Sequence, residues 1–195
     1  LKLYKDKSAI IPLGADILSM KNKKFDSLRL LYVGTLQDRD IDKTIKGISL
    51  LVKTHPSLNI KYDIIGDGFN NEIENFKELA KELDVDKVVT LHGYLHHDEL
   101  KSFYDNCNVG VSFVPITEFY DHQPVTKTYE YILAGIYTIA TRTFSNKQII
   151  NNENGFLIED TPESFAEGIE YIIANSKVFD SNKIRNTLID SQWET

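Results

Sequence analysis

The first clear structural signal in the sequence is Leu28-Arg29-Leu30-Leu31-Tyr32-Val33-Gly34, a short apolar run that ends at a glycine. A run of this kind bounded by a turn residue predicts a buried strand. Apolar residues then recur at helical spacing between Ile41 and Val52, and the pattern stops at His55-Pro56. A strand followed by an amphipathic helix is the repeating unit of a parallel sheet, so this stretch predicts an α/β fold.

The same alternation continues along the rest of the chain. Apolar runs predict strands at 60–65, 88–91, 109–114, 136–141 and 156–158, and helical spacing or capping residues predict helices at 73–83, 98–104, 126–133 and from 161 onward. Right-handed crossovers between such strands predict a doubly wound, mostly parallel sheet of about six strands with helices on both faces. These sheets bind ligands beyond the carboxyl ends of their strands, so we expect the site in the loops after Gly34, Gly66, Gly93 and Pro115.

The composition fits one folded domain and excludes several classes of protein. The 195 residues are 42% hydrophobic and 11% aromatic, which excludes a disordered chain. No apolar run approaches the roughly 18 to 20 residues of a membrane span. A single cysteine excludes a disulfide scaffold and suits a reducing cytoplasm. The net charge of −7 should repel nucleic acid, so a phosphate would have to bind at a local site.

Two common nucleotide-binding motifs are absent from the sequence. The loop after the first strand, Gly34-Thr35-Leu36-Gln37-Asp38-Arg39, contains one glycine, whereas a dinucleotide-binding loop needs G-x-G-x-x-G. No G-x-x-x-x-G-K-[ST] occurs, which excludes a P-loop NTPase. Arg39 itself is well placed beyond the strand to meet a phosphate.

The acidic cluster Asp38-Arg39-Asp40-Ile41-Asp42 does not match a metal-binding loop. An EF-hand would need a glycine and an acid where Lys43 and Ser49 stand. We expect these acids to cap the following helix and to complement its dipole.

The histidines and the cysteine give no sign of a metal site either. His92, His96 and His97 straddle a strand end and a loop and have no cysteine among them, so we expect a solvated cluster rather than a zinc site. Cys107 has no recognisable base partner and is expected to be a half-buried structural thiol. The sequence therefore predicts neither a metal nor another cofactor.

The stretch Gln123-Pro124-Val125-Thr126-Lys127-Thr128-Tyr129-Glu130 carries the strongest chemical signal. A proline just before a helix start leaves free N–H groups at Val125, Thr126 and Lys127, which together with the lysine ammonium suit a diphosphate. Glu130 lies one turn further on the same helical face, and its two acceptor oxygens suit the vicinal hydroxyls of a ribose. The spacing fits an ordinary i, i+3 surface ion pair equally well, and both interpretations stay open here.

Six motifs in order, covering nearly the whole chain, resemble the donor-binding C-terminal domain of GT-B glycosyltransferases, in the large retaining group often called family 4. They are Ile11-Pro12-Leu13-Gly14-Ala15-Asp16, Leu31-Tyr32-Val33-Gly34, Asp63-Ile64-Ile65-Gly66-Asp67-Gly68, His92-Gly93-Tyr94-Leu95 with Glu99-Leu100 and Tyr104, Val125-Thr126-Lys127-Thr128-Tyr129-Glu130-Tyr131 with Ala134-Gly135, and Asn154-Gly155-Phe156-Leu157. Ser191-Gln192-Trp193-Glu194-Thr195 also resembles the start of the family's tryptophan-centred terminal helix, cut short.

This resemblance implies a site for a nucleoside diphosphate sugar with UDP or GDP as the nucleotide, and transfer of the sugar with retention and without a metal. The diphosphate would be held by Arg39, Lys127, the amides of Val125 and Thr126, and the loop at Gly34 and Thr35. Glu130 would hold the ribose hydroxyls. The backbone around Gly93 and Tyr94 would contact the base.

The resemblance also implies an incomplete enzyme. Residues 1–27 would be a linker from an N-terminal acceptor domain, and residues 28–195 the donor-binding domain. The chain begins at Leu1 and its only methionine is Met20, so we expect a piece of a longer protein that is inactive by itself. The full protein would be a cytoplasmic bacterial enzyme of glycan biosynthesis, with a glycan or lipid-linked glycan as acceptor. Its other half would allow peripheral contact with the inner face of the membrane.

Two positions depart from the family pattern. Thr35 stands where an arginine is common, and His122 stands where the first acid of the family's E-x7-E signature would fall. That acid helps to place the transferred sugar, and Glu118 is a nearby acid to which we do not assign its role. These departures favour an alternative, a degenerate binding or interaction module that has lost turnover. A weaker alternative is a sugar nucleotide epimerase of similar fold, which would need carboxylates and histidines that we cannot place in the sequence.

Overall fold

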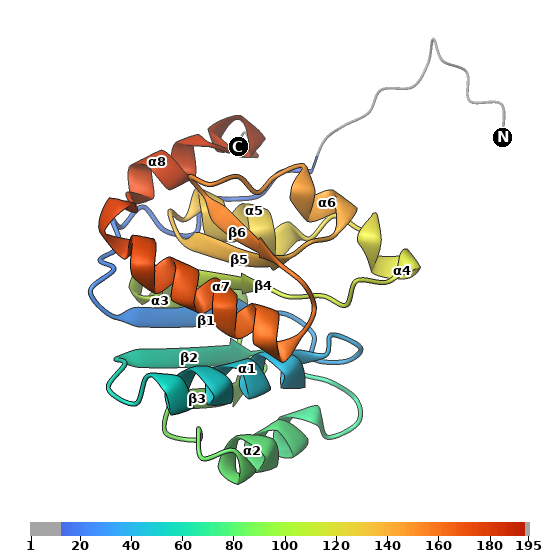
Figure 1. The fold of residues 1–195 in the computed structure, drawn as a ribbon. Coiled ribbons are helices and arrows are strands. Elements are labelled where there is room, and N and C mark those ends of the chain that lie inside the picture. Colours follow the sequence, from blue (N-terminus) through green and yellow to red (C-terminus); the bar gives the residue numbers. More distant parts are fainter. Residues whose placement is uncertain (1–12, 194–195) are drawn as a thin grey trace, which may run out of the picture.

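A computed structural model describes residues 13–193, which form a three-layer α/β fold (Figure 1). Six strands make one sheet in the order β3-β2-β1-β4-β5-β6, and every neighbouring pair is parallel. The predicted doubly wound sheet is confirmed, and it is wholly parallel. The strands are β1 (Leu28–Val33), β2 (Ile60–Ile65), β3 (Val89–Gly93), β4 (Val109–Ser112), β5 (Tyr137–Thr141) and β6 (Gly155–Ile158).

Helices cover both faces of the sheet, with α1 and α7 in front of it in Figure 1 and α3 and α5 behind it. The helices are α1 (Ile41–Thr54), α2 (Glu72–Glu82), α3 (His97–Asn106), α4 (Glu118–Asp121), α5 (Thr126–Leu133), α6 (Phe144–Lys147), α7 (Pro162–Asn175) and α8 (Ser181–Asn186), with short 3₁₀ turns η2 (Ser176–Val178) and η3 (Ile189–Ser191). Within the described residues, no helix is long and apolar enough to cross a bilayer.

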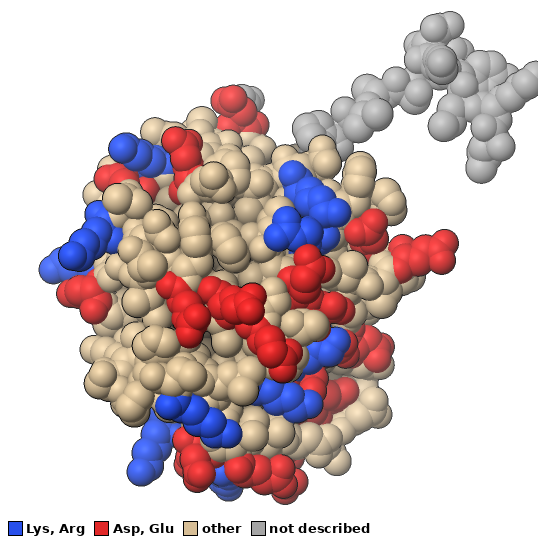
Figure 2. Space-filling view, viewed as in Figure 1, with Lys and Arg blue, Asp and Glu red and all other residues tan. Residues whose placement is uncertain are grey.

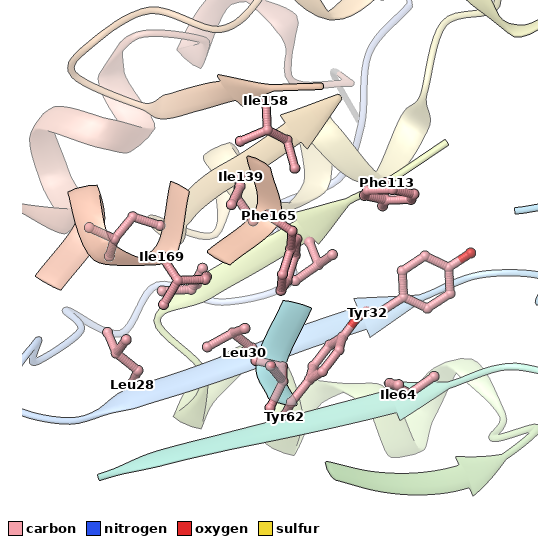
Figure 3. Close-up of a cluster of buried hydrophobic side chains, with 14 of the residues drawn as sticks. Leu28, Leu30, Tyr32, Tyr62, Ile64, Phe113, Ile139, Ile158, Phe165 and Ile169 are labelled. Carbon is pink, nitrogen blue, oxygen red and sulfur yellow. The ribbon is translucent and has the colours of Figure 1, made fainter. Parts of the chain in front are cut away.

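The central strand β1 supplies both hydrophobic cores because its side chains alternate between the two faces of the sheet. Leu28, Leu30 and Tyr32 join the core beneath α1 and α7, shown in Figure 3, where Phe165 of α7 lies among them. Leu31 and Val33 point to the opposite face and join the core beneath α3 and α5. Burial on both sides explains why the strand reads as an almost continuous apolar run.

The strand β4 ends at Ser112, two residues earlier than predicted. The reason lies in the backbone donors that follow. Val114 gives its N–H to the side-chain Oγ1 of Thr141 at 3.2 Å instead of to a neighbouring strand. Pro115 has no N–H to give. The chain therefore leaves the sheet and crosses its carboxyl edge, where α4 lies (Figure 1).

The acids before α1 do not cap the helix in the way that we expected. Asp40 occupies the N-cap position in a left-handed conformation (φ 51°), and its side chain makes no capping hydrogen bond. Its carboxylate instead pairs with Lys43 at 2.9 Å. Asp42 lies in the first turn, where it complements the helix dipole as expected, and it also pairs with Lys46 at 2.7 Å.

The described part of the predicted linker, residues 13–27, packs against the domain. Ala15 forms a parallel bridge with Gln192, and Ser19 donates from its hydroxyl to the Asp105 carboxylate at 2.7 Å. Lys23 is partly buried, and that burial lowers the pKa of its ammonium to about 8. The boundary at residue 27 stays a prediction. The start of the first family-like motif, Ile11-Pro12, and the last two residues, Glu194-Thr195, lie outside the described residues.

Candidate functional site

The candidate site lies at the carboxyl ends of β1 and β4, where the strand order reverses. This switch point is where open parallel sheets bind their ligands. Two adjoining pockets open there and share Val33, Gly34 and Thr35. The first pocket, about 250 Å³, lies between the loop after β1 and the start of α5. The second pocket, about 410 Å³, lies between the loops that follow β1, β2 and β3.

Backbone hydrogen bonds hold these loops together. Gly34 donates its N–H to the Ile65 carbonyl at 3.0 Å, and Gly66 donates to the Gly93 carbonyl at 2.9 Å. Gly66 has φ +151°, and a Cβ at this position would lie 1.7 Å from the carbonyl oxygen of Gly34. The loops after β1 and β2 are therefore packed too closely at Gly66, which lines the second pocket, to admit a side chain.

The first pocket brings together the predicted diphosphate ligands. Arg39, Lys127, Val125, Thr126, Gly34 and Thr35 all line it. The guanidinium of Arg39 lies 4.5 Å from the centre of the Tyr120 ring, a cation–π contact that holds it at the pocket wall. Tyr120, on the short helix α4, could not be predicted from the sequence, because a residue that supports an arginine far away in the chain has no spacing signature.

The start of α5 adds backbone donors to the same pocket. Val125 is the N-cap residue and is extended, and Thr126 begins the helix. In the described part of the chain, the N–H groups of Val125, Thr126 and Lys127 have no hydrogen-bond acceptor. Two cations and three free N–H groups therefore face one cavity, an arrangement that suits an anion with several oxygens.

A buried polar chain fixes the position of α5 beneath this pocket. The hydroxyls of Ser112 on β4 and Thr128 on α5 are 2.7 Å apart. Thr128 also donates to the side-chain oxygen of Asn146 at 3.0 Å, and the Asn146 amide donates to the Thr141 carbonyl at 2.9 Å. Satisfied buried networks of this kind are rigid, so the helix start is held in place before any ligand binds.

Glu130, the predicted ribose ligand, lies one turn behind Lys127 and lines neither pocket. Its Oε2 accepts from the Lys127 ammonium at 2.6 Å, so the i, i+3 ion pair of the structural interpretation is present. The same oxygen accepts from the Tyr104 hydroxyl at 2.7 Å. The carboxylate is thus preorganised beside the first pocket, and its role toward a ribose stays a prediction.

Of the two predicted base-binding residues, Tyr94 lines the second pocket and Gly93 does not. Tyr94 lines it and is 67% exposed, with Leu95 and His97 beside it. Gly93 lies behind, with φ +75°, and its carbonyl is engaged by Gly66. An exposed aromatic ring next to an apolar cavity offers a planar surface for a base.

The histidines do not converge. His92 is hydrogen-bonded to the Asp63 carboxylate at 2.7 Å. His96 is the N-cap residue of α3, and its N–H donates to the Glu99 carboxylate at 2.8 Å, whereas His97 lines the second pocket. Among residues 13–193, no three His, Cys, Asp or Glu side chains are arranged to hold a metal ion.

His122 lines neither pocket, although Tyr120 and Gln123 close to it in the chain line the first. It is exposed, and its ring centre is 4.5 Å from that of Phe144. Its Nε2 is 3.7 Å from the carboxylate of Asp121. Neither the histidine nor Glu118 lines the first pocket.

Cys107 is fully buried rather than half-buried, and burial raises the pKa of its thiol to about 12. Because the thiolate is the reactive form, we expect a thiol reagent such as DTNB to leave the native protein unlabelled at pH 8 on the time scale of minutes. The same protein in 6 M guanidinium should label rapidly at one site. Rapid stoichiometric labelling of the native protein would contradict this assignment.

The face of the molecule that Figure 2 shows carries acidic as well as basic side chains. Figure 2 shows acidic side chains across the face covered by α7, where Glu163, Glu167 and Glu170 are exposed. With a net charge of −7, an anion gains attraction only from a local group of donors. Such a group is present in the first pocket.

Comparison with known proteins agrees with this geometry. The family model described as "Glycosyl transferases group 1" matches residues 27–175. No curated protein matches the chain.

Solved structures share the fold at low sequence identity. The C-terminal domain of a glycosyl transferase group 1 family protein, LpcC from Francisella tularensis, is 18% identical with a TM-score of 0.68, covering 88% of this chain and 89% of that one. Sucrose-phosphate synthase from Thermosynechococcus elongatus is 19% identical with a TM-score of 0.69, covering 95% of this chain and 49% of that one. Anabaena Alr3699/HepE, solved in complex with UDP, is 14% identical with a TM-score of 0.63, covering 85% of this chain and 44% of that one.

Proposed function

The chain belongs to the group 1 glycosyl transferases, and from this premise we propose that it is the donor-binding half of an enzyme that transfers a sugar from a nucleoside diphosphate sugar to a glycan or other acceptor, with retention. The observation that carries the proposal is the first pocket, where Arg39, Lys127 and three free N–H groups at the start of α5 face one cavity. The adjoining second pocket has the apolar lining that a base would need.

The chemistry asked of the first pocket is charge stabilisation. When the bond between the sugar and the diphosphate breaks, negative charge builds up on the leaving diphosphate. Fixed cations and backbone dipoles stabilise that charge without needing to reorganise. In this proposal Arg39 and Lys127 take the part that a metal ion plays in other phosphate sites, so no metal is required.

Several parts of the proposal reach beyond this chain. The acceptor, a glycan or a lipid-linked glycan, would bind to an N-terminal domain that precedes the donor half. The full protein would work in the bacterial cytoplasm, in peripheral contact with the membrane through that domain. The chain spans 49% of the sucrose-phosphate synthase and 44% of the HepE chain, which supports a two-domain arrangement for the whole enzyme.

The environment of His122 favours a second candidate function, a nucleotide-sugar-binding module without turnover. The residue at the position of the first signature acid is exposed and packs against Phe144 instead of facing the first pocket. Sugar transfer or donor hydrolysis by the full-length protein would contradict this second function.

Thermal unfolding with UDP and with GDP tests the donor site directly. A ligand at 100 times its Kd should add about 2.7 kcal/mol of stability, which for a domain of this size raises Tm by about 5–10 °C. The HepE–UDP complex makes UDP the first choice. The variant Lys127→Ala/Glu130→Ala should lose the shift.

The matched control removes another helix ion pair, outside both pockets. Asp42→Ala/Lys46→Ala breaks a 2.7 Å contact on α1 and should keep the full shift. If neither nucleotide stabilises the unaltered protein, the donor-binding proposal is wrong.

A further inference from the structure

Tyr104 has an unusual position for a tyrosine, because its hydroxyl ends beside the carboxylate of the candidate ribose ligand. The residue lies on α3 with 0% exposure and donates to Oε2 of Glu130 at 2.7 Å. Burial raises the pKa of the Tyr104 hydroxyl well above its ordinary value, and the nearby Glu130 charge raises it further. The hydroxyl therefore stays protonated, and it can donate to the carboxylate but cannot compete with it for a proton.

The ring of Tyr104 is fixed as firmly as its hydroxyl. It stacks on Tyr131 of α5 with 5.7 Å between ring centres. The Tyr131 hydroxyl in turn accepts the Val33 N–H at the end of β1 at 2.9 Å. Gly110 makes room for this ring, since a Cβ there would lie 2.4 Å from Cγ of Tyr131. Two stacked tyrosines thus connect α3, α5 and the strand end at which both pockets meet.

The second donor to Oε2 is Lys127, which also lines the first pocket. An anion in that pocket would attract the ammonium away from Glu130. Tyr104 lines neither pocket and would keep its bond. The neutral Tyr104 hydroxyl would then still hold the Glu130 carboxylate while the Lys127 ammonium turns from this carboxylate to the anion.

We propose that Tyr104 is a positioning residue that holds the Glu130 carboxylate in place for the ribose hydroxyls of the nucleotide when Lys127 turns to the diphosphate. This inference rests on the proposed donor site and deepens it, because it assigns the ribose selectivity of that site to a residue on another helix.

The ratio of the affinities for a ribonucleotide and for the matching deoxyribonucleotide tests this role, since a merely structural tyrosine would not alter the ratio. The probes are UDP and 2′-deoxy-UDP, with GDP and 2′-deoxy-GDP as the second pair, measured by calorimetry. A hydrogen bond from a ribose hydroxyl to a well-placed carboxylate should make the unaltered protein prefer the ribonucleotide by about tenfold. Tyr104→Phe should reduce that preference to about twofold and leave the affinity for the deoxynucleotide unchanged.

Tyr62→Phe is the matched control. Tyr62 is also fully buried and also loses one hydrogen bond, to Thr44 at 3.1 Å, but it lies in the opposite core. The Tyr62→Phe variant should prefer the ribonucleotide over the deoxyribonucleotide as strongly as the unaltered protein does. In the Glu130→Ala background, Tyr104→Phe should have no further effect on the ratio.

The outcomes separate this inference from the donor site itself. A tenfold preference kept by Tyr104→Phe overturns the positioning role and leaves the donor site standing. No binding of any probe by the unaltered protein overturns both. If Tyr104→Phe fails to fold, Glu130→Asp serves in its place, because the shorter side chain keeps the charge and withdraws it from the Tyr104 hydroxyl. An undiminished preference of Glu130→Asp for the ribonucleotide would equally overturn the positioning role of Tyr104.

Discussion

Replacing Arg39 and Lys127 together by alanine should lower the affinity of the protein for UDP or GDP by about 100-fold or more. Each cation would make charge-assisted hydrogen bonds to phosphate oxygens, which contribute about 1.5–3 kcal/mol apiece. Every 1.4 kcal/mol is a factor of ten in Kd, so the two losses together span about two to four orders of magnitude. Both side chains line the first pocket, so neither loss should be replaced by another cation there.

The free nucleoside separates this electrostatic effect from general damage. Uridine or guanosine lacks phosphate, and its weaker affinity should change by less than about twofold, because the second pocket is lined by neither cation. Nucleotide binding by the unaltered protein should also weaken as salt rises, and binding by the double variant should depend on salt much less.

The matched control keeps the change in net charge and moves it elsewhere. Lys46→Ala/Lys77→Ala also removes two positive charges, from pairs on α1 and α2 with Asp42 and Glu74. Calorimetry should find its affinity for the nucleotide nearly unaltered. Full affinity in the Arg39→Ala/Lys127→Ala variant would exclude the first pocket as the diphosphate site.

The fold was predictable because its signals are local. Buried parallel strands read as apolar runs, and each of the six predicted runs became a strand. The short helices α4, α6 and α8 gave no such signal, because 4 to 6 residues are too few for a hydrophobic period. Each of them begins at a local side-chain cap, which is Thr117, Thr143 or Asp180. A tertiary contact adds to this at α6, where the Phe144 N–H donates to the Asp121 carboxylate at 2.7 Å.

The gathering of residues at the candidate site was predictable in part, and their roles stay predictions. The pairing of Lys127 with Glu130 follows from helical spacing, and the gathering of Gly34, Thr35 and Val125 follows from the meeting of strand ends at one edge. The contact from Tyr104 to Glu130 joins positions 26 apart on different helices, and no periodicity predicts it. The same limit applies to Tyr120 beneath Arg39, because a supporting contact depends on a loop path that only the folded chain defines.

Gly66 shows the opposite case, in which a sequence motif has a steric cause that the structure reveals. The G-D-G loop resembles a family signature, and its first glycine sits where the backbones of two loops meet. A Cβ on Gly66 would lie 1.7 Å from the Gly34 oxygen, closer than any non-bonded pair allows. The φ of +151° would add strain for any L side chain.

Gly66→Ala should therefore lower the free energy of unfolding by about 3 kcal/mol or more, the range of severe single substitutions. For a domain of this size the Tm should fall by about 6–12 °C, measured by circular dichroism or calorimetry. The loops after β1 and β2 would have to separate, which weakens the 3.0 Å bond between Gly34 and Ile65. Because Gly34 lines both pockets and Gly66 lines the second, nucleotide affinity should fall with stability.

Gly68→Ala, two residues away, is the control that separates steric exclusion from ordinary loss of a glycine. A Cβ there would meet the carboxylate of Glu72 at 2.5 Å. The end of this flexible, partly exposed side chain can rotate aside, at the cost of the 2.7 Å hydrogen bond that it accepts from the Asn70 N–H. No positive φ is required at Gly68, so the change should alter stability by less than about 1 kcal/mol. Equal losses in the two variants would mean that backbone contact between the loops does not set the geometry of the site, whereas a loss confined to Gly66→Ala would identify that contact as the element on which both pockets depend.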